Sequence, residues 1–279
     1  MKKISRRSFL AAAGLSVAAL ALTACGGSSA STASSVASSA ASSEAASTSA
    51  AAGELATVEA GKLTMATNAA FPPYEMTTDA GEFEGIDIET AQAIADKLGL
   101  ELQIDDMDFD AALLSVQQGK ADIVMAGVTV TDERKAVMDF SDSYATGIQS
   151  IIVPEGSDIA SPDDLAGKKI GTQRGTTGYI YCSDDFGDEN VVAYDDGLTA
   201  VQALNNGQVD AVVIDNAPAK EYVAANPGLA ILDTSYAEED YAIGMAKGSS
   251  LEAAVNAALE ELKADGTLQA IVDKYITAE

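Results

Sequence analysis

Histidine is absent from this 279-residue chain, and it has only two cysteines, Cys25 and Cys182. Because histidine is the commonest general base and the commonest metal ligand, its absence argues against hydrolase and zinc chemistry. Cys25 lies at a predicted processing site described below, which leaves Cys182 alone in the folded part. We therefore expect no disulfide between folded segments, no metal site and no cofactor.

Basic residues are also scarce. The chain has 16 Lys and Arg against 43 Asp and Glu, a formal net charge of -27. Such a chain repels phosphate backbones, so we expect no nucleic-acid partner. Net charge says little about the fold and is most simply explained by solubility. With 47% hydrophobic and 21% charged residues, the composition is that of a soluble globular protein.

The longest apolar run near the N-terminus, residues 9–22, is too short to span a membrane comfortably. Four basic residues precede it, which is the layout of a secretory signal peptide over residues 1–24. The run ends in Leu22-Thr23-Ala24-Cys25, which resembles a bacterial lipobox, whose cysteine is lipidated after cleavage. Residues 5–10 also resemble a twin-arginine export motif, so the export route stays open between that and an ordinary Sec signal.

The segment after Cys25 contains almost nothing that could form a core. Residues 28–52 are Ser, Ala and Thr, interrupted only by Val36 and Glu44. Without a periodic apolar face, this segment cannot offset the entropy of ordering. We expect a flexible tether over residues 25–57; a helix of small residues is the weaker alternative.

Strand and helix patterns alternate from Lys62 onward. Residues 63–67 alternate like a strand, 86–98 have helical spacing closed by Gly99, and 110–118 form a second helix before Gly119. A short strand is expected at 123–125, and two more helices at 251–264 and 267–275. The alternation predicts an α/β fold with a mostly parallel sheet.

One unit of this pattern occurs twice. In each copy an amphipathic helix stops at a glycine, an aspartate follows three residues later, and a β-branched strand comes next: Gly119 with Asp122, and Gly207 with Asp210. The repeat predicts two sheets built alike. We expect lobe 1 over 58–148 and 242–279, lobe 2 over 153–236, and crossing strands near 147–153 and 236–244. Clefts between such lobes are preferred ligand sites.

Seven short segments together resemble the family 3 extracellular solute-binding proteins, the polar amino-acid receptors of ABC transporters. They are residues 71–75 (FPPYE), 85–89 (GIDIE), 108–110 (DFD), 126–134 (AGVTVTDER), 139–144 (DFSDSY), 175–177 (GTT) and 213–215 (VID). Each is weak alone, but their order and spacing are specific. The resemblance implies a two-lobed periplasmic-binding-protein-like fold of type II, with two hinge strands crossing between the lobes.

The resemblance also implies a site for the two charges of a free amino acid. Arg134 would bind the α-carboxylate in a bidentate manner, with Thr129 offering a hydroxyl nearby. Gly127 would offer its carbonyl to the α-ammonium group. The weaker alternative for Arg134 is a helix-start surface residue, because residues 131–133 form a plausible cap.

From the second lobe, the resemblance implies that Asp215 pairs with the ammonium group, while Thr177, with Thr176 beside it, donates to the carboxylate. Phe71 and Phe109 would enclose the apolar stem of the ligand. Three alternatives stay open at this point: a helix cap for Asp215, a turn for Thr177, and core packing for the two aromatic rings.

Ligand specificity is expected from three further residues. Family members that bind cationic amino acids often have an acidic residue at the position of Asn68, so asparagine there favours a polar or neutral ligand. Gln173 and Arg174 would face the far end of the ligand, and Arg174 there would suit an acidic or amide-bearing one. Glu75, expected near the cleft mouth, keeps a cationic ligand open.

The expected protein is a monomeric lipoprotein at the outer face of the cell membrane. It would capture a free L-amino acid between its lobes and deliver it to the permease subunits of an ABC transporter, with no covalent chemistry. Two alternatives are a sensor whose closed form docks on a membrane receptor and, with less support, a dehydratase on the same fold. Cys182 is expected to be a small buried residue.

Overall fold

A computed structural model of the protein describes residues 55–276. The predicted signal peptide, the predicted lipidation site Cys25 and the tether up to residue 54 lie outside the described residues. Leu55, at the C-terminal end of the predicted tether, packs against the main hydrophobic core, and the backbone N–H of Val58 donates to Asp122 at 2.7 Å. Leu55 and Val58 therefore already belong to the globular body.

The first lobe contains a five-stranded sheet with the strand order β5-β1-β6-β14-β7. The strands are β1 (Lys62–Thr67), β5 (Glu101–Asp106), β6 (Ile123–Val124), β7 (Met138–Phe140) and β14 (Gly244–Ala246). The helices of this lobe are α1 (Ile86–Leu98), α2 (Phe109–Gln117), α3 (Asp132–Val137), α7 (Glu252–Ala264) and α8 (Thr267–Tyr275). A small antiparallel sheet consists of β2 (Ala70–Phe71), β3 (Glu75–Thr77) and β4 (Phe83–Glu84).

The second lobe contains a sheet with the order β10-β9-β11-β8-β12, and β13 also pairs with β8. The strands are β8 (Ala145–Pro154), β9 (Ile170–Gln173), β10 (Val191–Tyr194), β11 (Ala211–Asp215), β12 (Leu229–Ile231) and β13 (Ala237–Tyr241). The helices are α4 (Thr177–Phe186), α5 (Gly197–Asn205) and α6 (Asn216–Ala225), with short 3₁₀ turns η1 (Pro162–Leu165) and η2 (Asp188–Asn190).

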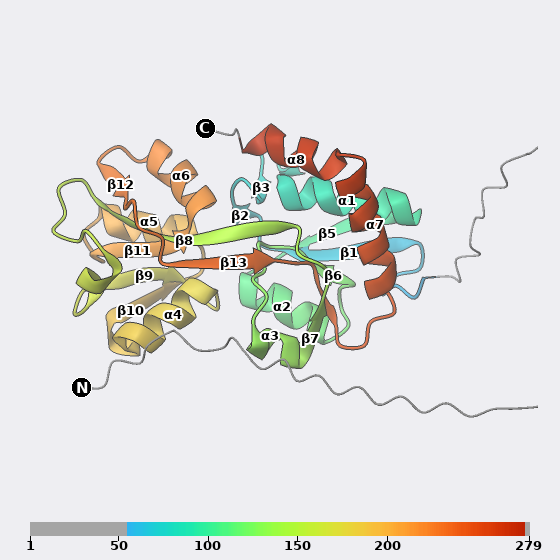
Figure 1. Ribbon diagram of the computed structural model, residues 1–279, viewed down its shortest axis with the longest axis horizontal. Helices are drawn as coiled ribbons and strands as arrows, with labels where there is room; N and C mark the ends of the chain where they lie inside the picture. The colour runs from blue at the N-terminus through green and yellow to red at the C-terminus, as the bar shows by residue number, and fades with distance from the viewer. Residues whose placement is uncertain (1–54, 277–279) are drawn as a thin grey trace, which may run out of the picture. The chain divides into compact units, whose positions relative to one another are not determined.

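Two long strands connect the lobes. In Figure 1, β8 and β13 lie side by side and run from one lobe to the other. They pair antiparallel over five positions, from Ala237 opposite Gln149 to Tyr241 opposite Ala145. After Tyr241 the chain enters β14, which joins the sheet of the first lobe. The two-lobed α/β fold with two crossing hinge strands is therefore confirmed.

The sheets are mixed rather than mostly parallel. Strands joined through a covering helix pair in parallel, as β1 does with β5 and β6, and β9 with β10 and β11. The strands that carry the chain between the lobes, β8, β13 and β14, pair antiparallel with their neighbours. The expectation of parallel sheets was wrong for these strands because they return along the sheet without a helical crossover.

Helix α1 shows why the pattern was readable. Its bounds coincide with the predicted range, and it ends at Gly99 with φ of 69°, a left-handed conformation that glycine adopts without strain. Asp87 and Glu89 lie in its first turn and Lys97 in its last, where their charges interact favourably with the helix dipole. Its buried face packs on helices α7 and α8.

The repeat predicted from the sequence has a structural meaning. Asp122 accepts a hydrogen bond from the backbone N–H of Thr64 at 2.8 Å, and Asp210 accepts one from that of Lys169 at 2.8 Å. Asp122 thus anchors the first half of β1, and Asp210 anchors the residue just before β9. In each case the anchored strand is the parallel neighbour of the strand that follows the aspartate. The same local device aligns the strands of both lobes.

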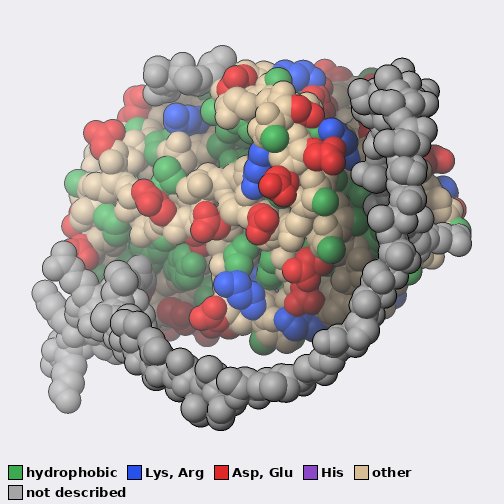
Figure 2. Space-filling view, turned by 45° about the vertical axis from the view of Figure 1, so that its right-hand side comes forward, with side chains coloured by type: hydrophobic (Ala, Val, Ile, Leu, Met, Phe, Trp, Pro, Cys, Tyr) green, Lys and Arg blue, Asp and Glu red, His purple; other side chains and the backbone are tan. Residues whose placement is uncertain are grey.

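Acidic side chains are spread over the surface. Figure 2 shows them scattered across one face, interleaved with fewer basic groups, rather than gathered in a single patch. Several are paired, such as Asp158 with Lys168 at 3.0 Å and Glu261 with Lys97 at 3.1 Å.

Inside the second lobe, burial raises the pKa of the Cys182 thiol to about 12, so this cysteine is an unreactive core residue.

A close contact fixes the hinge. Tyr241 is completely buried, and a Cβ atom added to Gly147 on the opposite strand would lie 2.5 Å from its ring. Glycine at position 147 therefore makes room for the Tyr241 ring between the two hinge strands. Since packed interiors have little spare volume, the Tyr241 ring cannot shift to another position.

We expect Gly147→Ala to lower the free energy of unfolding by about 1–3 kcal/mol, the usual range for overpacking. Urea denaturation monitored by circular dichroism measures this. Thr146→Ala, at an exposed position on the same strand, is the matched control and should change the value by less than about 0.5 kcal/mol. Equal stability of the two variants would contradict the steric argument.

Candidate functional site

A small cavity of about 20 Å³ lies between the lobes. Twelve residues line it: Asn68, Phe71, Glu75, Phe109, Ala126, Gly127, Thr129, Arg134, Gln173, Thr176, Thr177 and Asp215. Ten of the eleven predicted ligand-binding residues are among them; Arg174 is not. The structure thus brings together residues that are distant in sequence, from both lobes, around one space.

The lobes touch directly at the cavity. Gln173 Nε2 donates to Asn68 Oδ1 at 2.8 Å, and Arg134 Nη2 donates to the carbonyl of Gly175 at 3.2 Å. Away from the cavity, the Tyr222 hydroxyl of α6 donates to the carbonyl of Ala70 at 2.7 Å. These hydrogen bonds join the two lobes, so the structure is that of a closed form.

Arg134 lies in the first turn of α3, whose N-cap is Thr131. The helix-start reading is therefore correct for its backbone, but its side chain is directed inward and only 9% of the residue is exposed. Nη1 donates to the carbonyl of Thr129 at 2.8 Å, and the guanidinium lies 5.4 Å from the centre of the Phe109 ring. Burial lowers the arginine pKa, yet arginine stays cationic in proteins.

Asp215 occupies the N-cap position of α6, but its side chain makes no cap hydrogen bond. Its carboxylate instead accepts from Gln149 Nε2 at 2.8 Å and from the hydroxyl of Tyr241. Burial, with a smaller contribution from the charge of Glu239, raises the pKa of Asp215 to about 7. Burying the Asp215 carboxylate in this way costs free energy, and a cation bound in the cavity would reduce that cost.

Thr129 and Thr177 meet where the lobes meet, with their hydroxyl oxygens 3.5 Å apart. Both hydroxyls donate to Glu239 Oε2, at 3.1 Å and 2.9 Å respectively. Gln149 Nε2 donates to the same oxygen at 3.0 Å. Thr177 is thus more than a turn residue, since its side chain belongs to a buried polar network.

Helix α4 points its N-terminus at the cavity. Thr176 is its N-cap and accepts from the backbone N–H of Tyr179 at 3.3 Å, while its hydroxyl donates to the carbonyl of Gln173 at 2.8 Å. Thr177 is the first helical residue. The first N–H groups of a helix have no partner within it, and this end carries partial positive charge, so it suits a carboxylate.

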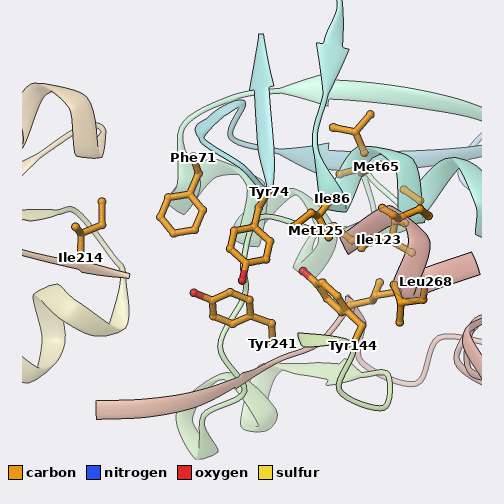
Figure 3. Packing of buried hydrophobic residues seen from close by; sticks show 14 of the residues in the cluster. Met65, Phe71, Tyr74, Ile86, Ile123, Met125, Tyr144, Ile214, Tyr241 and Leu268 are labelled. Atoms are coloured by element: carbon orange, nitrogen blue, oxygen red, sulfur yellow. The ribbon is translucent and has the colours of Figure 1, made fainter. Parts of the chain in front are cut away.

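Aromatic rings form the apolar wall of the cavity. Phe71 and Phe109 are nearly fully buried and also belong to the hydrophobic clusters, so they are core and cavity residues at once. In Figure 3, Phe71 stands beside Tyr74, and the Tyr241 hydroxyl points toward the lobe that carries Ile214. Phe71 stacks on Tyr74 at 6.0 Å between ring centres, and Tyr74 meets Tyr241 edge-on at 5.3 Å.

Glu75 lies on the floor of the cavity, not at its mouth, and is completely buried. It points inward because β3 pairs with β2 and β4 and places alternate side chains against the core. Burial and the adjacent carboxylate of Asp87 raise the Glu75 pKa well above its usual range, which favours the protonated, uncharged form of Glu75. Asp87 also accepts from Gly127 N at 3.0 Å and from the Tyr144 hydroxyl at 2.8 Å.

Arg174 lies outside the cavity. Its guanidinium contacts Asp195 at 3.8 Å and the carbonyl of Ala193 at 3.4 Å, and 55% of the side chain is exposed. It lines a separate, more open hollow together with Asp108 and Asp195. Gln173 points inward and Arg174 outward because consecutive residues at the end of a strand face opposite sides of the sheet.

Sequence reasoning missed three residues that hold the site from the hinge: Gln149, Glu239 and Tyr241. A usable signal was present in β13, where residues 237, 239 and 241 share one face of the strand. Since Tyr241 is a large aromatic residue with a core-facing side chain, Glu239 two residues earlier had to face inward as well. A charged residue on that face indicates a buried polar contact.

In residues 55–276, no cluster of acidic residues or cysteine is arranged to hold a metal ion. Across the same part of the chain, no helix combines the length and the apolar character needed to cross a membrane.

The buried carboxyl groups make stability depend on pH. Burial raises the pKa of Asp87 to about 6 and that of Asp215 to about 7, above an unfolded value of about 4. The folded chain then binds more protons than the unfolded chain between about pH 4 and 7, so its stability falls as pH rises through this window.

We expect the ligand-free protein to lose a few kcal/mol of unfolding free energy between pH 5 and pH 8, since one pKa unit corresponds to about 1.4 kcal/mol. Asp215→Asn, which cannot titrate, should show a shallower slope. Urea titrations at several pH values measure both. Identical slopes for the two proteins would contradict the assignment of the raised pKa to Asp215.

Residues 63–278 match the family of bacterial extracellular solute-binding proteins, family 3. The L-cystine-binding protein TcyJ of Escherichia coli strain K12 is 34% identical over 226 residues, which are 79% of this chain and 85% of that protein. A probable histidine-binding protein of Neisseria gonorrhoeae is 33% identical over 276 residues, 96% of this chain and 95% of the relative.

Solved structures agree with this match. An ancestral arginine-binding protein bound to glutamine superposes with a TM-score of 0.75 at 42% identity, covering 79% of this chain and 100% of that one. The family match over residues 63–278 extends over both lobes and includes every residue of the cavity. The chain therefore belongs to the bacterial extracellular solute-binding proteins of family 3.

Proposed function

We propose that the protein captures a free L-amino acid in the cavity between its lobes and delivers it to the permease of an ABC importer. The observation that carries the proposal is a pair of opposite buried charges, Arg134 and Asp215, in one cavity. Arg134 presents a guanidinium to an α-carboxylate, with the N-terminus of α4 beside it. Asp215 presents a carboxylate to an α-ammonium group.

The proposal includes closure as the step that ligand binding favours. Arg134 and Thr129 belong to the first lobe, and Asp215 and Thr177 to the second. A zwitterion held by both lobes has more partners in the closed form than in an open one, so it stabilises the closed form preferentially. No step requires a covalent bond or a cofactor.

The ligand is proposed to be polar or neutral in its side chain. The amide groups of Asn68 and Gln173 meet across the cavity, where they suit a hydrogen-bonding side chain. Glu75, protonated against Asp87, offers no full negative charge to a cation. Arg174 is turned outward, which leaves an acidic side chain without an obvious partner. Relatives named for cystine and histidine, and the ancestral arginine-binding protein bound to glutamine, fit this class, whereas other relatives are named for arginine, a cation.

The N-terminal segment is proposed to export the chain and anchor it through lipidated Cys25, with residues up to the globular body acting as a tether. The alignment with the Neisseria gonorrhoeae protein covers 96% of this chain, so it takes in most of this segment. The protein would then work as a monomer at the outer face of the cell membrane, close to its permease.

Wild-type protein, unfolded and refolded to remove bound ligand, should show a thermal shift with at least one of the twenty L-amino acids. A ligand at 100 times its dissociation constant stabilises the folded state by about 2.7 kcal/mol. No shift with any of the twenty would reject the proposed function and redirect attention to modified amino acids, peptides and turnover chemistry.

Arg134→Ala and Asp215→Ala should each weaken binding of that amino acid by about 30-fold or more, because truncating one partner of a buried charge pair costs roughly 2–5 kcal/mol. Isothermal titration calorimetry measures the loss, and circular dichroism checks the fold. Arg174→Ala is the control, since its side chain lies outside the cavity, and should bind like wild type. Unchanged affinity in either cavity variant would remove that residue from the site.

Cys25→Ser should move the full-length protein from the membrane fraction to the released fraction of an expressing bacterial host. Incorporation of a labelled fatty acid, measured on gels, should disappear in parallel. Cys182→Ser, at the buried cysteine, is the matched control and should keep both properties. Labelling that survives in Cys25→Ser would contradict the proposed anchor.

A further inference from the structure

A buried carboxylate on the hinge contacts both halves of the site. Glu239 belongs to β13, and only 7% of it is exposed. It is not among the residues that line the cavity, yet its Oε2 accepts from Thr129 in one lobe and Thr177 in the other. It therefore lies directly behind two hydroxyl groups that do face the cavity.

The position of Glu239 decides what those hydroxyls can offer a ligand. A threonine hydroxyl has one proton to donate and two lone pairs to accept with. Both hydroxyls donate to Glu239, over 3.1 Å from Thr129 and 2.9 Å from Thr177, so both protons are directed to this carboxyl group. On the cavity side, the two oxygens are left as acceptors.

Gln149 extends the same arrangement to Asp215. Its Nε2 donates to Asp215 Oδ2 at 2.8 Å and to Glu239 Oε2 at 3.0 Å. The same nitrogen also lies 3.5 Å from the Thr177 hydroxyl oxygen. An amide nitrogen has two protons, so the two shorter contacts use both, and they fix the amide with its nitrogen toward the carboxylates. The Tyr241 hydroxyl donates to the other oxygen of Asp215.

This end of the cavity thus presents acceptors only: a carboxylate and two hydroxyl oxygens. An α-ammonium group has three N–H donors and matches such a set, whereas a carboxylate would meet no donor there. The expectation that the Thr177 hydroxyl donates to the α-carboxylate does not fit its hydrogen bond to Glu239. That role falls to Arg134 and to the backbone N–H groups at the start of α4.

We propose that Glu239 is a positioning residue that orients the Thr129 and Thr177 hydroxyls as acceptors for the α-ammonium group, and does so only when the lobes are closed. The inference rests on the proposed function, because it assumes an amino-acid ligand. Since Glu239 joins a threonine of each lobe, its two hydrogen bonds form together at closure. Glu239 thereby links recognition of the α-ammonium group of the ligand to the closed form.

A double-mutant cycle tests this with L-glutamine and L-arginine as probes, titrated by calorimetry. Glu239→Ala should weaken binding by about tenfold or more, the usual worth of a hydrogen bond to a charged group. Thr129→Val removes the hydroxyl that Glu239 orients. If Glu239 acts through the threonine, the double variant loses clearly less than the product of the two single losses.

Two further measurements separate positioning from general support of the fold. Glu239→Gln keeps an acceptor oxygen and should recover most of the affinity lost in Glu239→Ala. The des-amino analogues 4-carbamoylbutanoate and 5-guanidinopentanoate, which lack the ammonium group, should lose less than about threefold in Glu239→Ala. Glu238→Ala, exposed on the same strand, is the matched control and should bind like wild type.

The outcomes are distinguishable. If another amino acid gives the strongest shift in the panel of twenty, it and its own des-amino analogue replace the probes. Wild type that binds no amino acid would reject the proposed function and this inference with it. Wild type that binds, with Glu239→Ala unaffected, with losses that multiply in the double variant, or with equal losses for ligand and des-amino analogue, would reject the role of Glu239 alone.

Discussion

The structure depends on the cost of burying charge without a counter-charge. Between the lobes lie Arg134 and several carboxyl groups, in a space that solvent scarcely reaches. Taking such groups out of water is expensive unless hydrogen bonds or opposite charges replace the lost hydration. Several polar groups around the cavity serve that need, including the backbone carbonyls that hold Arg134 and the donors that surround Asp215 and Glu239.

The hinge follows from the same constraint. Gln149 on β8 and Glu239 and Tyr241 on β13 all reach the carboxylate cluster from the strands that join the lobes. The Tyr241 ring can take this place only because residue 147 has no side chain. A packing requirement between two strands therefore supports a polar arrangement in the adjacent cavity.

Much of the fold could be predicted because its signals are local. Helix α1 is bounded by glycine and carries its apolar residues at helical spacing, and the repeated glycine and aspartate pairs identify two similar units. The inward direction of Gln173 and Asn68 could also be anticipated, once a cleft was assumed. The antiparallel pairing of β8, β13 and β14 could not, because strand direction is decided by contacts between segments far apart in the chain.

The least predictable residues were those whose role depends on a neighbour's proton. Glu75 was expected at the cleft mouth, since a carboxylate is usually solvated, but beside Asp87 it is kept protonated and lies on the cavity floor. Glu239 gave no motif at all, because its partners come from three different segments. Only the assembled structure shows which acceptors compete for which donors.

The cavity lies next to the two strands about which the lobes would rotate. Ligand contacts there act on a short lever arm, whereas the outer rims of the lobes are far from the axis. A displacement of a fraction of an ångström at Thr129 and Thr177 would then correspond to a much larger displacement at the rims. A membrane partner that reads the separation of the rims could distinguish filled from empty protein without touching the amino acid itself.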